Sequence, residues 1–264
     1  MTLEKKINEA VKKINLKEYD TIYVAGNIYN FGFSFNKTKL FCENLINNLL
    51  ITTKNKINIV VPTSTLNLLK KKNPIFSNNT KSFMMGIFSE FVRSKKESFR
   101  SSHPLWSFSG IGKDIKDILN QTSCSAYGKG SVFEKLLKKK TLFVSMGKPH
   151  RSLAMLHYAE HVVGVPYRFN KEFNIKVKTN NKIRKKYCLL GVRYDSKKII
   201  GDGNKKIINK LIKKKIFNII KLNKGNLYCA DYNSLVNELI NILNNNPKIW
   251  LKNESISQNN YTNC

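Results

Sequence analysis

Short apolar runs alternate along this chain with longer segments in which apolar residues recur every three or four positions. A short apolar run between polar or glycine-containing turns predicts a buried strand, and the longer spacing predicts a helix with one apolar face. Such alternation is typical of layered folds in which helices pack on both faces of one sheet. The sequence therefore predicts an α/β fold, a three-layer α/β/α sandwich around a central mixed sheet.

The same alternation gives approximate ranges for the individual elements. Strands are expected at residues 21–25, 57–61, 141–146 and 186–194. Helices are expected at residues 3–14, 38–50, 131–137, 152–163, 205–213 and 232–243. Asp231 stands where a side chain can cap the first free amide groups of the last helix, so it is expected as the N-cap.

The domain organisation follows from length and from the absence of breaks in composition. The 264 residues suffice for one large domain with its own core. No internal repeat and no linker rich in Pro, Gly and Ser interrupts the chain, so we expect one domain over residues 1–250, with a smaller C-terminal elaboration, and a frayed tail at 251–264. Neither a signal peptide nor a run of about 18 apolar residues is found, which predicts a cytoplasmic protein without a membrane partner.

The net charge of +30 comes from 47 Lys and Arg against 17 Asp and Glu. An excess of this size is compatible with a polyanionic partner such as nucleic acid. The lysines are spread along the whole length beside Asn and Ile, which indicates compositional bias more than one binding surface. We therefore expect no specific nucleic-acid partner. A nucleic-acid-binding protein stays the alternative that explains the charge and leaves the motifs below unexplained.

Residues 100–112 (RSSHPLWSFSGIG) are the first segment rich in reactive groups. A cation, hydroxyl groups and an imidazole can hydrogen-bond phosphate or amide groups, and glycines let a backbone approach a ligand closely. Taken alone, the segment is equally compatible with a turn in which Pro104 and Trp106 pack inward.

Residues 156–161 (LHYAEH) are the second such segment. His157 and Glu160 are three positions apart on an expected helix, so their side chains share a face. An imidazole has an unperturbed pKa of about 6.5 and can accept a proton near neutral pH, while a carboxylate orients the ring. His157 is thus a candidate general base, with Glu160 or Asp195 as its carboxylate partner. An interior imidazole with no catalytic function is the structural alternative.

The segment also matches H-x-x-E-H, a motif in which two histidines bind zinc and the glutamate activates water. Such a site needs a further carboxylate ligand, and the downstream candidate Glu238 is expected on the polar side of the last helix. The five cysteines contain no C-x-x-C pair, which argues against a zinc knuckle or a disulfide framework. We expect neither a metal nor a redox cofactor, and a zinc peptidase stays an alternative.

Several segments, taken in order, resemble the motifs of the aminoglycoside 3-N-acetyltransferase family. They are residues 100–104 (RSSHP), Ser107 with Phe108, Gly112, residues 127–131 (YGKGS) and residues 156–160 (LHYAE). The resemblance extends from about residue 19 to about residue 194. It implies an α/β/α domain that binds acetyl-CoA or another acyl-CoA in a cleft and acylates a primary amine of a sugar, with His157 as the general base.

The resemblance also implies where the acyl-CoA binds. The candidate residues have small or hydrogen-bonding side chains: Gly32, Arg100, Ser101, His103, Ser107, Gly128 and Ser131. The family usually shows a His-x-Ser-Leu stretch after the first strand, and this chain departs from it in the segment that ends at Gly32. That glycine precedes an expected helix, whose N-terminal amide groups could still face a phosphate. We expect direct attack on the thioester, since no Cys or Ser has the pattern of an activated nucleophile.

Two departures from the antibiotic-modifying members concern the acceptor. Those members carry a Glu-x-Asp pair where this chain has RYD at 193–195, and a polycationic aminoglycoside needs an acidic pocket. Residues 164–173 (GVPYRFNKEF) are similar to polysaccharide-pathway members, which acylate amino sugars carried on a nucleotide diphosphate. Tyr167, Arg168 and Arg193 are therefore candidate acceptor-binding residues. We expect an amino-sugar acceptor, and an aminoglycoside-resistance enzyme is the alternative.

Overall fold

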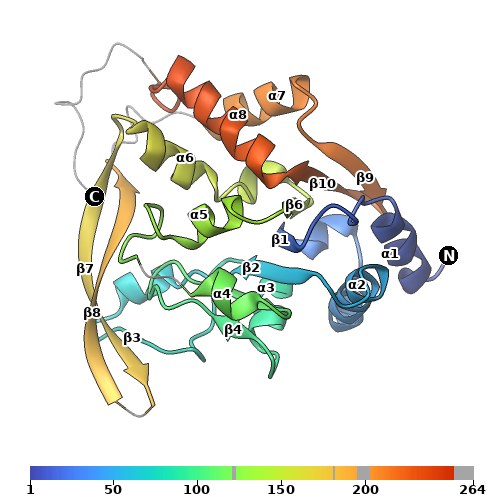
Figure 1. Ribbon diagram of the computed structural model, residues 1–264, viewed down its shortest axis with the longest axis horizontal. Helices are drawn as coiled ribbons and strands as arrows, with labels where there is room; N and C mark the ends of the chain where they lie inside the picture. The colour runs from blue at the N-terminus through green and yellow to red at the C-terminus, as the bar shows by residue number, and fades with distance from the viewer. Residues whose placement is uncertain (121–122, 181, 195–202, 253–264) are drawn as a thin grey trace.

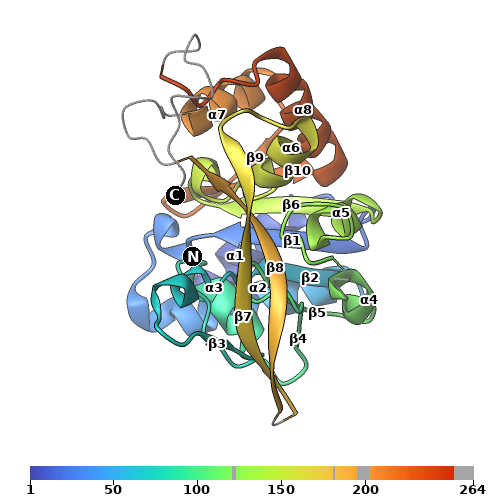
Figure 2. The same cartoon turned by 90° about the vertical axis from the view of Figure 1, so that its left-hand side faces the viewer.

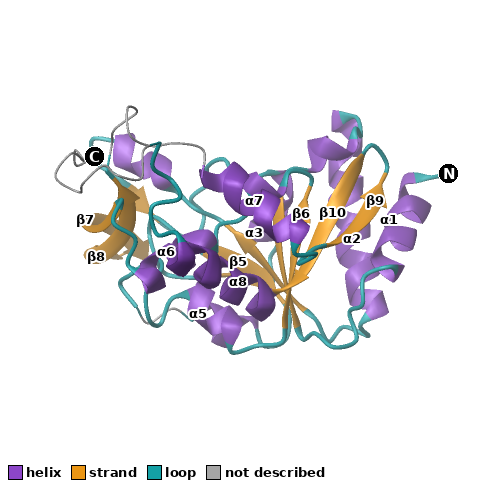
Figure 3. Cartoon of the chain, turned by 90° about the horizontal axis from the view of Figure 1, so that it is seen from above, coloured by secondary structure: helices purple, strands orange, loops and turns teal. Residues whose placement is uncertain are grey.

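The computed structural model describes residues 1–120, 123–180, 182–194 and 203–252. Within these ranges, seven strands form a central sheet in the order β4-β5-β2-β1-β6-β10-β9. Helices lie on both faces of this sheet (Figure 3). The predicted α/β/α sandwich is therefore confirmed.

The bounds of the elements are as follows. The central sheet contains β1 (Thr21–Gly26), β2 (Asn58–Pro62), β4 (Phe99–Arg100), β5 (Phe108–Ile111), β6 (Thr141–Met146), β9 (Asn218–Leu222) and β10 (Gly225–Asp231). A second sheet contains β3 (Ile75–Phe76), β7 (Arg168–Thr179) and β8 (Lys182–Arg193). The α-helices are α1 (Leu3–Lys12), α2 (Thr38–Thr52), α3 (Ile87–Arg93), α4 (Ile115–Leu119), α5 (Val132–Leu137), α6 (Leu156–Val163), α7 (Gly203–Lys213) and α8 (Tyr232–Asn245).

The middle of the central sheet is parallel and its outer strands are antiparallel. Thr21 of β1 pairs with Asn58 of β2 on one side and with Thr141 of β6 on the other, both in parallel. β5 and β10 then pair antiparallel with β2 and β6. All six residues of β6 are buried, as expected for a strand covered on both faces.

Side-chain alternation along the strands divides the interior into two apolar layers. In β1, Ile22 and Val24 pack with α1, α2 and α3, whereas Tyr23 and Ala25 pack with α5, α6 and α8 on the opposite face. Successive residues of a strand point to opposite faces, so one strand can serve both layers. α6, the helix that carries His157, is therefore anchored in the second layer, and it packs against α8.

Some predicted ends of helices agree with the structure, and others differ. The side chain of Asp231 caps α8 by accepting a hydrogen bond from the amide of Ser234 at 2.8 Å. The helix expected at 152–163 begins only at Leu156, because a 3-10 turn (Pro149–Arg151) precedes it. Leu251, in the expected tail, is fully buried. Residues 253–264 lie outside the described part of the chain.

β7 and β8 pair antiparallel over their whole length and form a twisted ribbon across one end of the sandwich (Figures 1 and 2). At the base of the ribbon, Arg168 is opposite Arg193 and Asn170 is opposite Gly191. This base lies next to α6, as the hydrogen bonds described below show. Within the described ranges, no helix combines the length and the apolar character required to cross a bilayer.

Candidate active site

The turn that follows α6 brings the base of the ribbon back to the helix. Gly164 ends α6 with a φ of +70°, a conformation that costs glycine little because it has no Cβ. The chain reverses there and enters β7 at Arg168. Because of this reversal, Tyr167 and Arg168 return to the face of α6 that carries His157 and Glu160.

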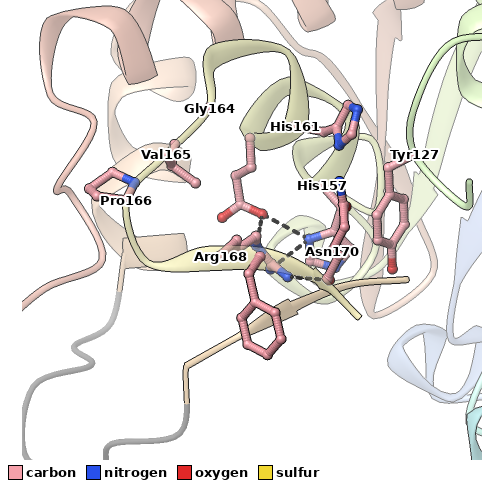
Figure 4. A pocket seen from close by; sticks show the side chains of 11 residues that line it. Tyr127, His157, His161, Gly164, Val165, Pro166, Arg168 and Asn170 are labelled. Atoms are coloured by element: carbon pink, nitrogen blue, oxygen red, sulfur yellow. Dashed lines mark hydrogen bonds and ion pairs between the residues drawn. The ribbon is translucent and has the colours of Figure 1, made fainter. Parts of the chain in front are cut away.

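A pocket of about 330 Å³ opens at this junction (Figure 4). Its walls come from α6, from the loop before α5 and from the base of the ribbon, and they include Tyr127, His157, His161, Arg168, Asn170 and Gly191. The His157 side chain is 27% exposed. The ring therefore opens onto the pocket and is not an isolated interior imidazole.

Nδ1 of His157 has two neighbours of opposite charge. It lies 3.0 Å from Oε2 of Glu160 and 2.9 Å from Nη2 of Arg168. A carboxylate only accepts hydrogen bonds and a guanidinium only donates them, so Nδ1 can bond to one of the two at a time. When Nδ1 carries the proton it donates to Glu160, and the lone pair is then on Nε2, the ring nitrogen that is not engaged by Glu160 or Arg168.

Glu160 is fully buried, with a side-chain exposure of 0%, and contacts His157, Tyr167 and Arg168. Its Oε1 accepts a hydrogen bond from the hydroxyl of Tyr167 at 3.1 Å. Its Oε2 lies 2.6 Å from Nε of Arg168, in an ion pair that is not aligned as a hydrogen bond. Burial alone would raise the pKa of Glu160, but the charge of Arg168 and the bonds from His157 and Tyr167 outweigh it and lower the pKa. The carboxylate is thus ionised at neutral pH.

The pKa of His157 is lowered, first by burial and then by the charge of Arg168. The negative charge of Glu160, and its hydrogen bond when Nδ1 is protonated, offset part of this lowering of the pKa, and the charge of Arg193 adds to it. A histidine with a lowered pKa is neutral at pH 7 and can take up a proton. The electrostatics therefore match the requirement for a general base.

Two aromatic rings form the wall behind His157. Trp106 lies edge-on at 5.7 Å between ring centroids, and Tyr127 lies at 5.2 Å. Trp106 belongs to segment 100–112, so this segment does approach the candidate base. Tyr127 was not among the expected site residues, although its place in the YGKGS segment was a signal that could have identified it.

Arg100 was expected to contact CoA, but its side chain does not face the pocket. Arg100 is 6% exposed and donates hydrogen bonds to the carbonyl oxygens of Thr63 at 2.7 Å and Asn78 at 3.1 Å. It also donates to Oγ of Ser107 at 3.0 Å and lies over the ring of Phe76. The guanidinium therefore ties together the segments that follow β2 and β3, and its contact with CoA stays a prediction.

The other polar residues of this segment are buried as well. Oγ of Ser101 accepts a hydrogen bond from the amide of Phe108 at 2.9 Å, and Nδ1 of His103 accepts one from the amide of Trp106 at 2.9 Å. Burial lowers the pKa of His103 to about 4, so this ring stays neutral at physiological pH. The polar atoms of Ser101, His103 and Ser107 are thus used inside the protein, and a role for these residues in a CoA cleft stays a prediction.

Of the remaining expected CoA contacts, one is structural and one borders the pocket. Ser131 is buried and caps α5, accepting from the amide of Glu134. Gly128 lies beside the pocket, and a Cβ at this position would come within 3.0 Å of Nε2 of His161. Gly32 is exposed and ends a 3-10 turn with a φ of +69°. A role for Gly32 near a phosphate stays a prediction.

The expected acceptor residues separate in the same way. Tyr167 is fully buried and donates a hydrogen bond to Glu160. Arg168 lines the pocket, and its contact with the acceptor stays a prediction. The guanidinium of Arg193 lies 4.6 Å from the ring of Trp250, and Arg193 is not among the described residues of the pocket wall. Asp195, the other expected partner of His157, lies outside the described residues.

The arrangement of the H-x-x-E-H residues does not fit a zinc peptidase. Glu160 is engaged by Arg168, and Glu238 lies 2.7 Å from Nζ of Lys214 in an ion pair. Across the described ranges, His, Cys, Asp and Glu side chains form no group of three that could hold a metal ion.

The structural role of Arg100 leads to a first prediction. We expect Arg100→Met to lower the free energy of unfolding by about 2 kcal/mol or more, because several buried carbonyl groups lose their donor. Urea unfolding measures this loss, and calorimetry should show an unchanged affinity for acetyl-CoA in the folded variant. A variant with normal stability and weakened CoA binding would restore the ligand role.

Comparison with known proteins now identifies the family. The family model of aminoglycoside 3-N-acetyltransferase matches residues 35–244, most of the chain. The chain belongs to this family. It is therefore a CoA-dependent N-acyltransferase with acetyl-CoA as its co-substrate. A search of curated protein sequences finds no match.

Several solved structures share the fold at low sequence identity. The YokD protein from Bacillus subtilis has a TM-score of 0.76 at 20% identity, covering 93% of this chain and 100% of that chain. AAC-IIIb in a binary complex with CoASH has a TM-score of 0.79 at 16% identity, covering 92% and 97%. AAC-VIa bound to sisomicin has a TM-score of 0.74 at 16% identity, covering 92% and 97%.

Proposed function

We propose that this enzyme transfers an acetyl group from acetyl-CoA to the primary amine of an amino sugar carried on a nucleotide, in the synthesis of a surface polysaccharide. His157 is the general base, and transfer is direct, without an acyl-enzyme. The observation that supports this proposal best is the contact between Nδ1 of His157 and the buried carboxylate of Glu160 at 3.0 Å, at the wall of an open pocket.

The reaction needs one proton to move. As the amine nitrogen attacks the thioester carbonyl carbon, a proton passes from the nitrogen to Nε2 of His157. The carbon–sulfur bond breaks as the amide forms, and the imidazolium can return the proton to the leaving sulfur. Glu160 stabilises the imidazolium through Nδ1 and fixes the orientation of the ring. No metal or redox group takes part in this scheme.

The charges at the pocket favour an acceptor that is not a polycation. Of the described residues that line the pocket, Glu160 has the one carboxylate, and Arg168 already pairs with it. The imidazole of His161 and the guanidinium of Arg168, which also line the pocket, carry no negative charge. The pocket wall therefore offers few negative charges to the ammonium groups of a polycationic aminoglycoside. It offers the Arg168 guanidinium to the phosphate of a phosphate-bearing amino sugar.

A comparison of acceptors tests this part of the proposal. We expect kcat/KM for a nucleotide-diphosphate amino sugar to exceed that for sisomicin by at least about 100-fold, since a few unfavourable charge contacts are worth several kcal/mol. Release of CoA thiol measures both rates. Efficient turnover of sisomicin, together with aminoglycoside resistance of an expressing host, would instead support the antibiotic-modifying alternative.

The pH dependence of the rate tests the base. The pKa of His157 is lowered, and the base is active when neutral, so kcat should be constant at neutral pH and fall below a midpoint under the usual value of about 6.5. The pH profile of kcat is measured with saturating concentrations of acceptors whose amines differ in pKa. If the loss of activity at low pH comes from the enzyme, its midpoint is the same for every acceptor. A midpoint above pH 7 that follows the acceptor would argue against His157.

A further inference from the structure

The contact between Arg168 and His157 raises a problem for a general base. Nη2 of Arg168 lies 2.9 Å from Nδ1, and a guanidinium nitrogen can only donate a hydrogen bond. This contact is favourable only when Nδ1 has its lone pair, which places the ring proton on Nε2, whereas the contact with Glu160 is favourable only when Nδ1 carries the proton, so the two neighbours compete for Nδ1. In that tautomer Nε2, the nitrogen that takes the amine proton in the proposed mechanism, already carries a proton and cannot accept another.

We propose that Arg168 holds His157 in this inactive tautomer until an anionic group of the acceptor draws its Nη2 away. Nδ1 then takes up a proton from water and forms an N–H hydrogen bond to the ionised Glu160, while Nε2 releases its proton to water and becomes the base. One proton is gained and one is lost, so the ring stays neutral. Arg168 is thus a positioning residue that links the charge of the acceptor to the readiness of the base. This inference rests on the proposed function.

The remaining contacts of the guanidinium show why Nη2 is the part that can change partner. Nη1 of Arg168 donates to the carbonyl oxygen of Gly191 at 2.9 Å, and Nε is held by the buried Glu160. Among the described residues, Nδ1 of His157 is the one partner found for Nη2. The Arg168 side chain is 12% exposed at the pocket. An anion in the pocket can therefore reach the guanidinium and offer Nη2 a charged acceptor in place of a neutral nitrogen.

The movement of Nη2 of Arg168 away from His157 also assists the chemical step. During transfer His157 becomes an imidazolium, and a guanidinium at 2.9 Å from Nδ1 raises the energy of that state. An anion bound to Arg168 offsets the repulsion. The other polar groups near the pair are Tyr167 on Glu160, Tyr127 beside the ring, Arg193 through its charge, and His161 and Asn170 in the pocket wall.

Nitrogen NMR of the histidine rings tests the tautomer directly, without any enzymatic turnover. The chain has four histidines, and His157→Gln assigns the signal. At pH 8 without phosphate, we expect the His157 ring to show an unprotonated Nδ1. Addition of inorganic phosphate should shift it toward a protonated Nδ1, while sodium chloride at equal ionic strength should not.

The chain supplies an internal reference for this measurement. Nδ1 of buried His103 accepts hydrogen bonds from the amides of Leu105 and Trp106, and its Nε2 lies 3.2 Å from the carbonyl oxygen of Leu189. That ring is fixed with its proton on Nε2 and should not respond to phosphate. A His157 ring that already has a protonated Nδ1 without phosphate would overturn the inference.

Kinetics supply the second readout. With glucosamine, an amino sugar without phosphate, we expect inorganic phosphate to raise kcat of the wild-type enzyme about tenfold, if about one tenth of the enzyme has the active tautomer at rest. Arg168→Met should lose this stimulation and shift the acid limb of the kcat profile to higher pH. Lys176→Met, which removes an exposed cation farther along the ribbon, should keep both. Equal stimulation in wild type and Arg168→Met would overturn the inference.

The two proposals can fail separately. Full activity of His157→Ala would reject the general base and with it the role of Arg168. Loss of activity in His157→Ala, combined with a tautomer that ignores phosphate, would leave the base in place and reject the role of Arg168. If Arg168→Met does not fold, the NMR measurement on the wild-type protein still decides.

Discussion

His157→Ala is expected to lower kcat by about 10²- to 10⁴-fold while the affinity for acetyl-CoA stays nearly unchanged. The reason is that the imidazole takes the amine proton in the transition state, and in the proposed scheme it makes no contact with CoA on which binding depends. Steady-state rates of CoA release measure kcat, and calorimetry measures acetyl-CoA binding to the same preparation. Equal rates in the two proteins would remove His157 from the mechanism.

His161→Ala is the matched comparison, because this second histidine lies one turn along α6 and also lines the pocket. We expect it to lower kcat less than about tenfold, since no step of the proposed mechanism uses its ring. A zinc site built on H-x-x-E-H would require both histidines equally, and chelators would then abolish activity. Similar large losses in both variants, together with chelator sensitivity, would therefore restore the metal alternative.

Glu160→Ala is expected to have the largest effect on stability, lowering the free energy of unfolding by about 3–5 kcal/mol. The carboxylate is fully buried and is the counter-charge of Arg168, whose side chain is 12% exposed. Its removal leaves a mostly buried guanidinium uncompensated and also removes the acceptor for Tyr167. Denaturant unfolding of wild type and variant measures the difference.

Two conservative variants separate charge from hydrogen bonding at this position. Glu160→Gln keeps the shape but loses the charge, and its amide can donate to Nδ1 of His157, so we expect kcat to fall by up to about 10⁴-fold through the wrong tautomer. Tyr167→Phe removes one neutral donor and should cost about 1 kcal/mol of stability. Glu160→Gln with wild-type kcat would show that another group, such as Asp195, orients the base.

Much of the layered fold could be predicted because the buried strands carry an unambiguous pattern. β6 is buried at all six positions and mostly apolar, and its predicted range 141–146 is the observed one. β9 and β10 were missed because Lys, Asn and Gly interrupt their apolar residues. Their place is set by pairing with β6 and with each other, and single-sequence patterns carry no information on such long-range pairing.

The ribbon of β7 and β8 shows the same limit at the site. β7 was not expected as a strand, since its residues alternate between charged and apolar with little burial. Only the pairing of the two strands brings Gly191 opposite Asn170 at the pocket. Arg168 was expected to contact the acceptor, but its ion pair with Glu160 depends on the turn at Gly164.

Taken by itself, the sequence determined the family, the α/β/α layering and the candidate base, because local periodicity and a helical spacing of three residues are properties of neighbouring positions. Tertiary structure decided which polar groups line the pocket. Arg100, Ser101, His103 and Ser107 have the chemistry of a binding site, yet they are buried and bonded within the protein. Burial depends on what the rest of the chain places over a residue. Only the tertiary structure therefore distinguishes a polar residue that stabilises the protein interior from one that lines the pocket.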